Sequence, residues 1–198
     1  MEFRDITHDK KTLYRLAENE QGVFFMLNRS DAITFELAGT KAAAYVFAFF
    51  VGTGDKQIVL NIAQQHLARE TTSRVLVKSV LRDQSQFSYR GTLHIGKNAP
   101  LSDASQENRN LLLSGETKAF SEPALEILNN DVRCHHAATT SPLSAEQLFT
   151  LQTRGLSRKQ AENLLVSGFL RSSLTAMQKL VPREEQEKVL SLLGQIAA

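Results

Sequence analysis

The sequence predicts a β domain followed by a small helical segment, and two observations support this prediction. From about residue 22 to residue 140, short apolar runs recur every ten to fourteen residues, and many of them alternate apolar with polar side chains. That pattern is typical of β-strands. After residue 140 the apolar spacing becomes helical and helix-capping sequences appear. We therefore expect a β core over residues 1–140 and a C-terminal helical domain over residues 141–198.

The expected strands are rich in Val, Ile and Phe, and turn clusters such as Gly52–Asp55 and Lys97–Pro100 separate them. In chain order they are Val23–Leu27, Ile33–Leu37, Tyr45–Val51, Ile58–Ile62, Val75–Leu81, Phe87–Ile95, Leu111–Leu113, Leu125–Leu128 and Val132–His136. Regular spacing of this kind suits a sandwich, a jelly roll or a β-helix. No repeat of fixed length is visible, so the pattern alone leaves these three architectures open.

The helical segment contains two sequences of the capping-box type, Ser144–Gln147 and Ser157–Gln160. In such a box the Ser and Gln side chains each accept a hydrogen bond from the other residue's backbone amide. The first box predicts a short helix that Gly155 ends, and the second predicts a longer helix that Pro182 interrupts before a third helix. The expected apolar stripes are Ala161, Leu164, Leu165, Phe169, Leu174, Met177 and Leu180, then Val189, Leu190, Leu193 and Ile196.

Composition excludes several classes of protein. The 198 residues carry a formal net charge of only +2, and Lys and Arg are scattered, which argues against nucleic-acid binding. The most apolar stretch, Ala42–Val51, has about ten residues, whereas a membrane helix needs about twenty. The single cysteine allows no internal disulfide, and the first residues lack the order of a secretion signal. We expect a cytoplasmic protein without a membrane or nucleic-acid partner.

The common catalytic motifs are missing from the sequence. Gly52–Asp55 lacks the Lys and Ser or Thr of a phosphate-binding loop, and an apolar strand follows it where such a loop needs a helix. The sequence contains no Gly-x-Ser-x-Gly elbow, no His-Glu-x-x-His pair and no Cys-x-x-Cys pair. We therefore expect that the protein is not an enzyme.

One cluster of potential ligands stands out, at Cys134, His135 and His136. In a strand, Cys134 and His136 face one way and His135 the other, so a thiolate and an imidazole could converge on one metal or cluster. The same residues also fit a buried structural cysteine beside incidental imidazoles, or a nucleophile pair, for which no oxyanion site is apparent. The residues alone leave these alternatives open, and His8, His66 and His94 are expected to be surface or packed residues.

Several ordered segments together resemble a known family. They are His66, Thr72–Ser73, Phe87–Gly91, Gln106–Ser114, Pro123–Ile127, Asn130–Thr140, Leu148–Phe149 and Arg154–Ser157. Over about residues 60–170, this order is similar to the C-terminal core of SufB and SufD. The resemblance implies a right-handed parallel β-helix followed by a helical segment, in a protein about half as long as most family members.

The resemblance also implies a role in building iron–sulfur clusters with the ABC-type ATPase SufC. Cys134 and His136 match a Cys and a His two residues apart in SufD-like members, whose His lies at the subunit interface where the cluster is expected to form, so a transiently bound iron–sulfur cluster is the expected cofactor. SufB-like members have a Cys and a Glu where this chain has Thr117 and Ala137. The chain therefore looks SufD-like, with Cys134 and His136 as the expected metal and cluster ligands.

Three functional hypotheses follow from these observations. The first is a scaffold component that holds a cluster at an interface with a SufB-like subunit or with itself, together with a SufC-type ATPase. The second is a non-catalytic interaction or regulatory module of the same fold without a cluster. The third, a metal- or Cys-dependent enzyme on a cupin-like barrel, would need more ligands than the two that we identify.

In a β-helix we expect Val59, Leu76, Leu93 and Ile127 to form the core.

Overall fold

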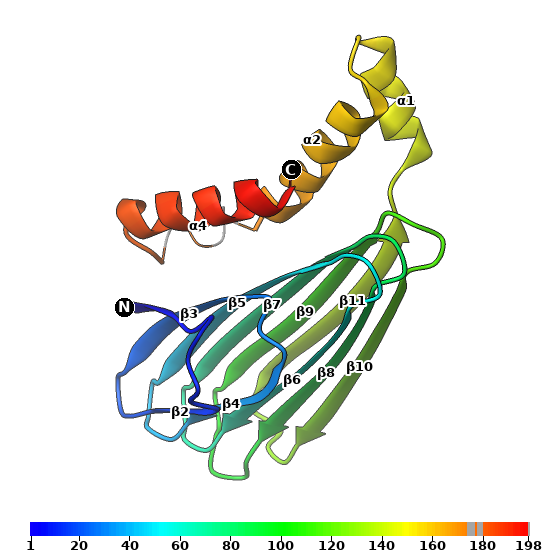
Figure 1. Cartoon of the computed structure of the whole chain (residues 1–198). Coiled ribbons are helices and arrows are strands. Elements are labelled where there is room, and N and C mark those ends of the chain that lie inside the picture. Colours follow the sequence, from blue (N-terminus) through cyan, green and yellow to red (C-terminus); the bar gives the residue numbers. More distant parts are fainter. Residues whose placement is uncertain (174–176, 178–179, 198) are drawn as a thin grey trace.

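The fold is a parallel β-helix followed by helices, as expected (Figure 1). We describe it from a computed structural model, in residues 1–173, 177 and 180–197. The strands are β1 (Glu2–Asp5), β2 (Leu13–Leu16), β3 (Gln21–Leu27), β4 (Asp31–Leu37), β5 (Ala43–Gly52), β6 (Gln57–His66), β7 (Thr72–Leu81), β8 (Gln86–Ile95), β9 (Asp103–Leu112), β10 (Lys118–Ile127) and β11 (Arg133–Pro142). The helices are α1 (Ala145–Thr153), α2 (Arg158–Arg171) and α4 (Arg183–Ala197).

Successive strands alternate between two parallel sheets. One sheet has the order β1-β3-β5-β7-β9-β11 and the other has the order β10-β8-β6-β4-β2. Each coil therefore contributes one strand to each sheet, and every strand pairs with the strand two places away in the sequence. Because paired strands are parallel and in register, side chains at matched positions form rows along the molecule.

The core lies between the two sheets and is built mainly from alternate residues of each strand. At its N-terminal end, the Phe35 ring lies 4.9 Å from the ring of Phe24 and 5.4 Å from that of Tyr14, measured between centroids. All three rings are buried. Aromatic rings at these separations contribute both buried area and favourable edge or offset contacts.

A second apolar cluster lies on the outer face of the six-stranded sheet, where the helical segment covers it (Figure 1). Phe25, Phe49 and Val80 of the sheet pack in one cluster with Val166 of α2 and Val189 of α4. Both faces of the central strands β3, β5 and β7 are therefore buried, which explains their long apolar runs. No helix in the described ranges is long and apolar enough to span a membrane.

Polar contacts also attach α2 to the sheet. The Lys78 ammonium of β7 donates to the Phe169 carbonyl oxygen at 2.5 Å and to Ser172 Oγ at 2.8 Å, and lies 4.6 Å from the centre of the Phe169 ring. Nearer the start of the helix, Arg82 forms an ion pair with Glu162. Lys78 thus caps the carbonyl end of α2, where a positive charge is favoured.

The strand predictions were correct in place but incomplete. Strands β1 and β2 were not expected, and the runs Leu111–Leu113 and Leu125–Leu128 mark only the ends of β9 and β10. Strand β9 was largely missed because its inward side chains after Ala104 are the polar Gln106, Asn108 and Asn110. Apolar periodicity does not detect such a strand.

The core prediction needs three corrections. Leu93 is buried as expected, but Val59 is 48% exposed because the alternate residues Ile58 and Leu60 point inward. Leu76 packs under the helices on the outer face and not between the sheets. Ile127 is 41% exposed because β10 is the last strand of its sheet.

The expected helices are present, with one difference in length. Ser144 and Ser157 cap α1 and α2, and the capping box at Ser157 is complete. The second helix ends at Arg171, whereas its apolar stripe was expected to continue to Leu180. Met177, a member of the expected apolar stripe, is buried in the outer cluster. Leu174 and the side chain of Ile196 lie outside the described part of the chain.

Candidate ligand site in the last coil

Cys134 and His136 lie on β11, the last strand of the six-stranded sheet, and face the interior of the β-helix. In register, Cys134 pairs with Ala104 and His136 with Gln106 of β9, and both of these neighbours are buried between the sheets. His135 faces the opposite side, as strand alternation predicts. Cys134 is half-buried and packs against the buried cluster of Leu93, Ile95, Ala99 and Ala104, whereas His136 is exposed.

The environment of Cys134 favours the protonated thiol. Burial raises the pKa of Cys134, and the nearby Asp103 carboxylate raises it further. The thiolate is the form that binds metals, so binding here must displace a proton. Cys134 is therefore poorly suited to act as a nucleophile in the isolated chain.

The two candidate ligands do not form a closed metal site. Among the described residues, no group of three or more His, Cys, Asp and Glu side chains could hold a metal ion. Alternate residues of a strand lie about 7 Å apart, so Cys134 and His136 can contribute two ligands from one side. Iron–sulfur clusters are usually held by four ligands, and the remaining ones would have to come from outside this pair.

The site lies at an open end of the β-helix. Strands β10 and β11 each have ten residues and form the edges of their sheets. Phe120, Leu125, Ile127 and Leu128, on or just after β10, are all more than two-fifths exposed. Long edge strands with exposed apolar side chains can pair with another chain.

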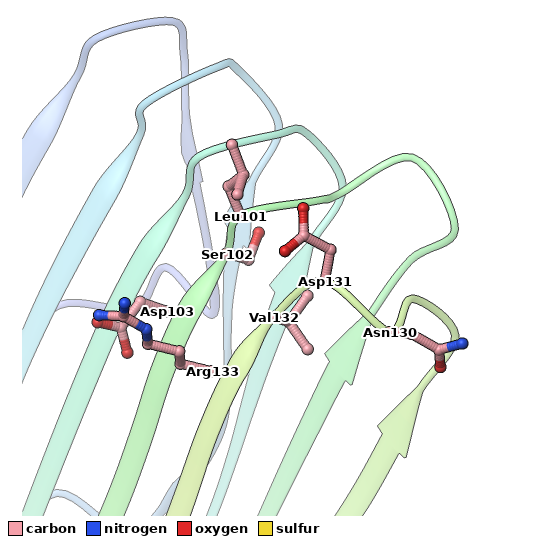
Figure 2. A pocket seen from close by; sticks show the side chains of 7 residues that line it. All are labelled: Leu101, Ser102, Asp103, Asn130, Asp131, Val132 and Arg133. Atoms are coloured by element: carbon pink, nitrogen blue, oxygen red, sulfur yellow. The ribbon is translucent and has the colours of Figure 1, made fainter.

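A surface pocket of about 460 Å³ lies where β9 and β11 begin (Figure 2). Its lining residues are Leu101, Ser102, Asp103, Asn130, Asp131, Val132 and Arg133. Neither Cys134 nor His136 lines it, although Arg133 directly precedes Cys134. Asp103 is already paired with Arg74 at 2.7 Å. The pocket is therefore next to the candidate ligands but is not their site.

The two positions where the resemblance led us to expect a Cys and a Glu in SufB-like proteins also lie in the last coil. Thr117 is buried in the turn before β10, and its hydroxyl donates to the Ser114 carbonyl oxygen at 2.7 Å. Ala137 lies on β11 with its side chain on the outer face, in register with Glu107. Neither residue can supply a thiolate or a carboxylate.

Sequence reasoning missed a group of buried polar side chains inside the β-helix, on strands β6, β7 and β9. These residues are Gln64, His66, Ser73, Gln106, Asn108 and Asn110, and each is at most 2% exposed. The alternation of strand residues could have revealed them. In β6 the inward-facing apolar positions that begin at Ile58 continue, two residues at a time, to Gln64 and His66. His66 is packed, as expected, and burial lowers the pKa of His66 to about 4.

The chain represents a class of proteins with a two-sheet parallel β-helix. Its last coil is open, and a helical segment covers one of the two sheets. Residues 24–169 match the family model described as the SufBD core domain of the SUF system for iron–sulfur cluster assembly. The chain belongs to this SufBD family of iron–sulfur cluster assembly proteins. The match extends further upstream than the expected resemblance over about residues 60–170.

Curated relatives support the family assignment. The chain is 34% identical to SufB of Bacillus subtilis over 105 residues, which cover 53% of this chain and 23% of that protein. It is 33% identical to a SufBD family protein of Staphylococcus saprophyticus over 132 residues, 67% of this chain and 28% of the relative. A SufBD family protein of Synechocystis is 30% identical over 165 residues, 83% and 36% of the two chains. The matched region thus spans about a quarter to a third of each relative.

Proposed function

We propose that this protein is a SufD-like, non-catalytic scaffold component that holds an iron–sulfur cluster transiently during assembly in the cytoplasm. The observation that carries this proposal is the location of Cys134 and His136 on one face of β11, at the edge of the sheet. The cluster is cargo that the scaffold passes on. The chain contributes one thiolate and one imidazole, which is half of a four-ligand set.

A second subunit would supply the other ligands. The exposed edges of β10 and β11 support pairing either with a SufB-like subunit or with a second copy of this chain. In a two-fold homodimer the same patch meets itself, so two Cys and two His would come together. With a SufB-like partner, the Cys and Glu that Thr117 and Ala137 replace would come from the other chain.

We further propose that the division between residues 1–140 and residues 141–198 is functional, with the helical domain binding a SufC-type ATPase. Phe149 of α1 and Leu164 of α2 are 67% and 52% exposed. Helix α2 is held against the sheet by Val166 and Leu170, whereas no residue of α1 is buried. Exposed apolar side chains on these two helices favour a protein partner.

The alternative is an interaction or regulatory module that binds assembly partners without a cluster. The packing of Cys134 against the buried cluster of Leu93, Ile95, Ala99 and Ala104 favours this alternative, because it is also the environment of a structural cysteine. Ligand substitutions distinguish the two proposals.

We expect Cys134→Ser and His136→Ala each to lower the iron and sulfide retained after anaerobic reconstitution by at least about tenfold. The physical reason is that each variant removes one of only two ligands from this chain. Retention is measured by metal and sulfide analysis after gel filtration, with the chain alone and with a SufB-like partner. One cluster per two chains is the expected stoichiometry.

His135→Ala is the matched control, because His135 is on the same strand but faces outward. It should retain as much cluster as the unmodified protein. If Cys134→Ser and His136→Ala also retain as much, the pair is structural and the interaction module is the better proposal.

We expect Phe149→Glu and Leu164→Glu each to weaken binding to a SufC-type ATPase by about tenfold or more, because a carboxylate would replace a buried apolar contact. Calorimetry measures the affinity, and Gln195→Glu on the exposed side of α4 is the charge-matched control. Unchanged affinity in both variants would exclude this helical surface as the ATPase site.

A further inference from the structure

A continuous chain of hydrogen bonds runs inside the β-helix from the surface pocket to the residue next to His136 on the adjacent strand. It begins at Ser102, which lines the pocket, and ends at Gln106 on β9. The successive distances are 2.8 Å from Ser102 to Thr71, 2.7 Å to His66, 2.7 Å to Ser73, 2.6 Å to Gln64 and 3.2 Å to Gln106. All six side chains are at most 2% exposed.

The direction of this chain follows from its first members. The Thr71 hydroxyl donates to the Ala68 carbonyl oxygen at 3.0 Å, so Thr71 Oγ1 accepts from both Ser102 and His66. His66 is neutral, because burial lowers its pKa to about 4. Its proton is therefore on Nδ1, and Nε2 accepts from the Ser73 hydroxyl.

The same logic fixes the amide of Gln106. Ser73 has used its proton and accepts from Gln64 Nε2, which leaves Gln64 Oε1 as an acceptor. Gln106 Nε2 donates to that oxygen, and Gln106 Oε1 remains buried without a hydrogen-bond partner among the residues that the structure describes. Buried acceptors without partners are rare and call for an explanation.

The opposite sheet leaves space for this carboxamide. A Cβ atom at Gly91 of β8 would lie 2.3 Å from Gln106 Nε2 and 2.4 Å from Oε1. Any other residue at position 91 would therefore displace the Gln106 amide. The glycine, together with the hydrogen bond to Gln64, holds the free oxygen in place.

His136 is the neighbour of Gln106 in the same inward-facing row. The two residues are in register on the adjacent parallel strands β9 and β11. Four residues further along the same two strands, the equivalent inward-facing pair already forms a hydrogen bond, from Asn110 Nδ2 to Thr140 Oγ1 at 3.0 Å. The spacing of these strands thus allows side chains in this row to bond to each other.

We infer that Gln106 is a positioning residue for His136: its free Oε1 accepts the N–H of the imidazole when the other ring nitrogen binds the cluster. This inference rests on the proposed ligand role of His136. A ligating histidine commonly donates its second N–H to a fixed acceptor, which sets the ring orientation and strengthens the ligand. The hydrogen-bond chain from Ser102 to Gln64 keeps that acceptor from turning away.

A double-mutant cycle tests the inference by the iron concentration needed for half-maximal cluster retention. We expect Gln106→Leu to raise that concentration by about tenfold to a hundredfold. In a His136→Ala background the same change should have no further effect, because Gln106 acts through His136. In this buried position Gln106→Glu is expected to carry a protonated carboxyl group, whose O–H can donate to Gln64 Oε1 while the other oxygen accepts from His136, so this variant should restore most of the retention.

One further variant, Gly91→Ala, and one comparison keep the test decisive. Gly91→Ala retains the Gln106 side chain but displaces its amide, and it should reproduce the loss if Gln106→Leu folds poorly by circular dichroism. An additive loss in the His136→Ala background, or unchanged retention in both Gln106→Leu and Gly91→Ala, overturns the positioning role. Failure of the proposed function is different, because His136→Ala itself would then have no effect.

Discussion

The stability advantage of the unmodified protein over Lys78→Met should grow by about 2 to 3 kcal/mol between pH 7 and pH 10. Lys78 is 1% exposed, and within the described part of the chain no carboxylate forms a hydrogen bond or ion pair with its ammonium. Burial lowers the pKa of Lys78 to about 8, with a further lowering by Arg109 that Glu107 partly opposes. The measurement is urea unfolding of both proteins at several pH values.

The sign of this effect follows from proton binding. Below about pH 8 the lysine is protonated in both the folded and the unfolded chain. Between about 8 and 10.5 the folded chain has released a proton that the unfolded chain still holds, so the free energy of unfolding rises with pH. Methionine has a similar length and cannot titrate, so comparison with Lys78→Met removes the contributions of other groups.

A constant difference between the two proteins across this pH range would contradict a lowered pKa of Lys78. Lys188→Met is the control, because Lys188 is more than half exposed on α4. The pKa of Lys188 is raised by its hydrogen bond to Glu185, so its removal should produce no rise in relative stability from pH 8 upwards.

Phe35→Ala should lower the free energy of unfolding by about 3 to 5 kcal/mol. Phe35 is fully buried between the sheets, and its ring contacts the rings of Phe24 and Tyr14. Removal of the ring leaves a cavity that two parallel sheets cannot close, because their spacing is set by the neighbouring coils. Chemical denaturation followed by circular dichroism measures the change.

Phe120→Ala is the matched control for the aromatic core. Phe120 is 56% exposed on β10, so its removal from the isolated chain should change stability by no more than about 0.5 kcal/mol. A loss for Phe35→Ala similar to that for Phe120→Ala would mean that the aromatic group at the first coils does not hold the sheets together.

Local features of the molecule could be predicted from the sequence because they depend on neighbouring residues. Ser144 and Ser157 cap their helices because each hydroxyl accepts a hydrogen bond from a backbone amide only three residues further on. Cys134 and His136 share a face because strand alternation has a period of two. The family motifs added the parallel β-helix, which the apolar spacing could not separate from a sandwich or a jelly roll.

Tertiary structure decided which face of each strand is buried and which elements cover that face. Val59 and Leu76 were expected in the core, but register directs both to the outer face, where only Leu76 is covered by helices. Gln106 is polar in sequence, yet the coils on either side enclose it and Gly91 leaves space for its amide. These outcomes depend on contacts between residues tens of positions apart, which a local apolar pattern does not contain.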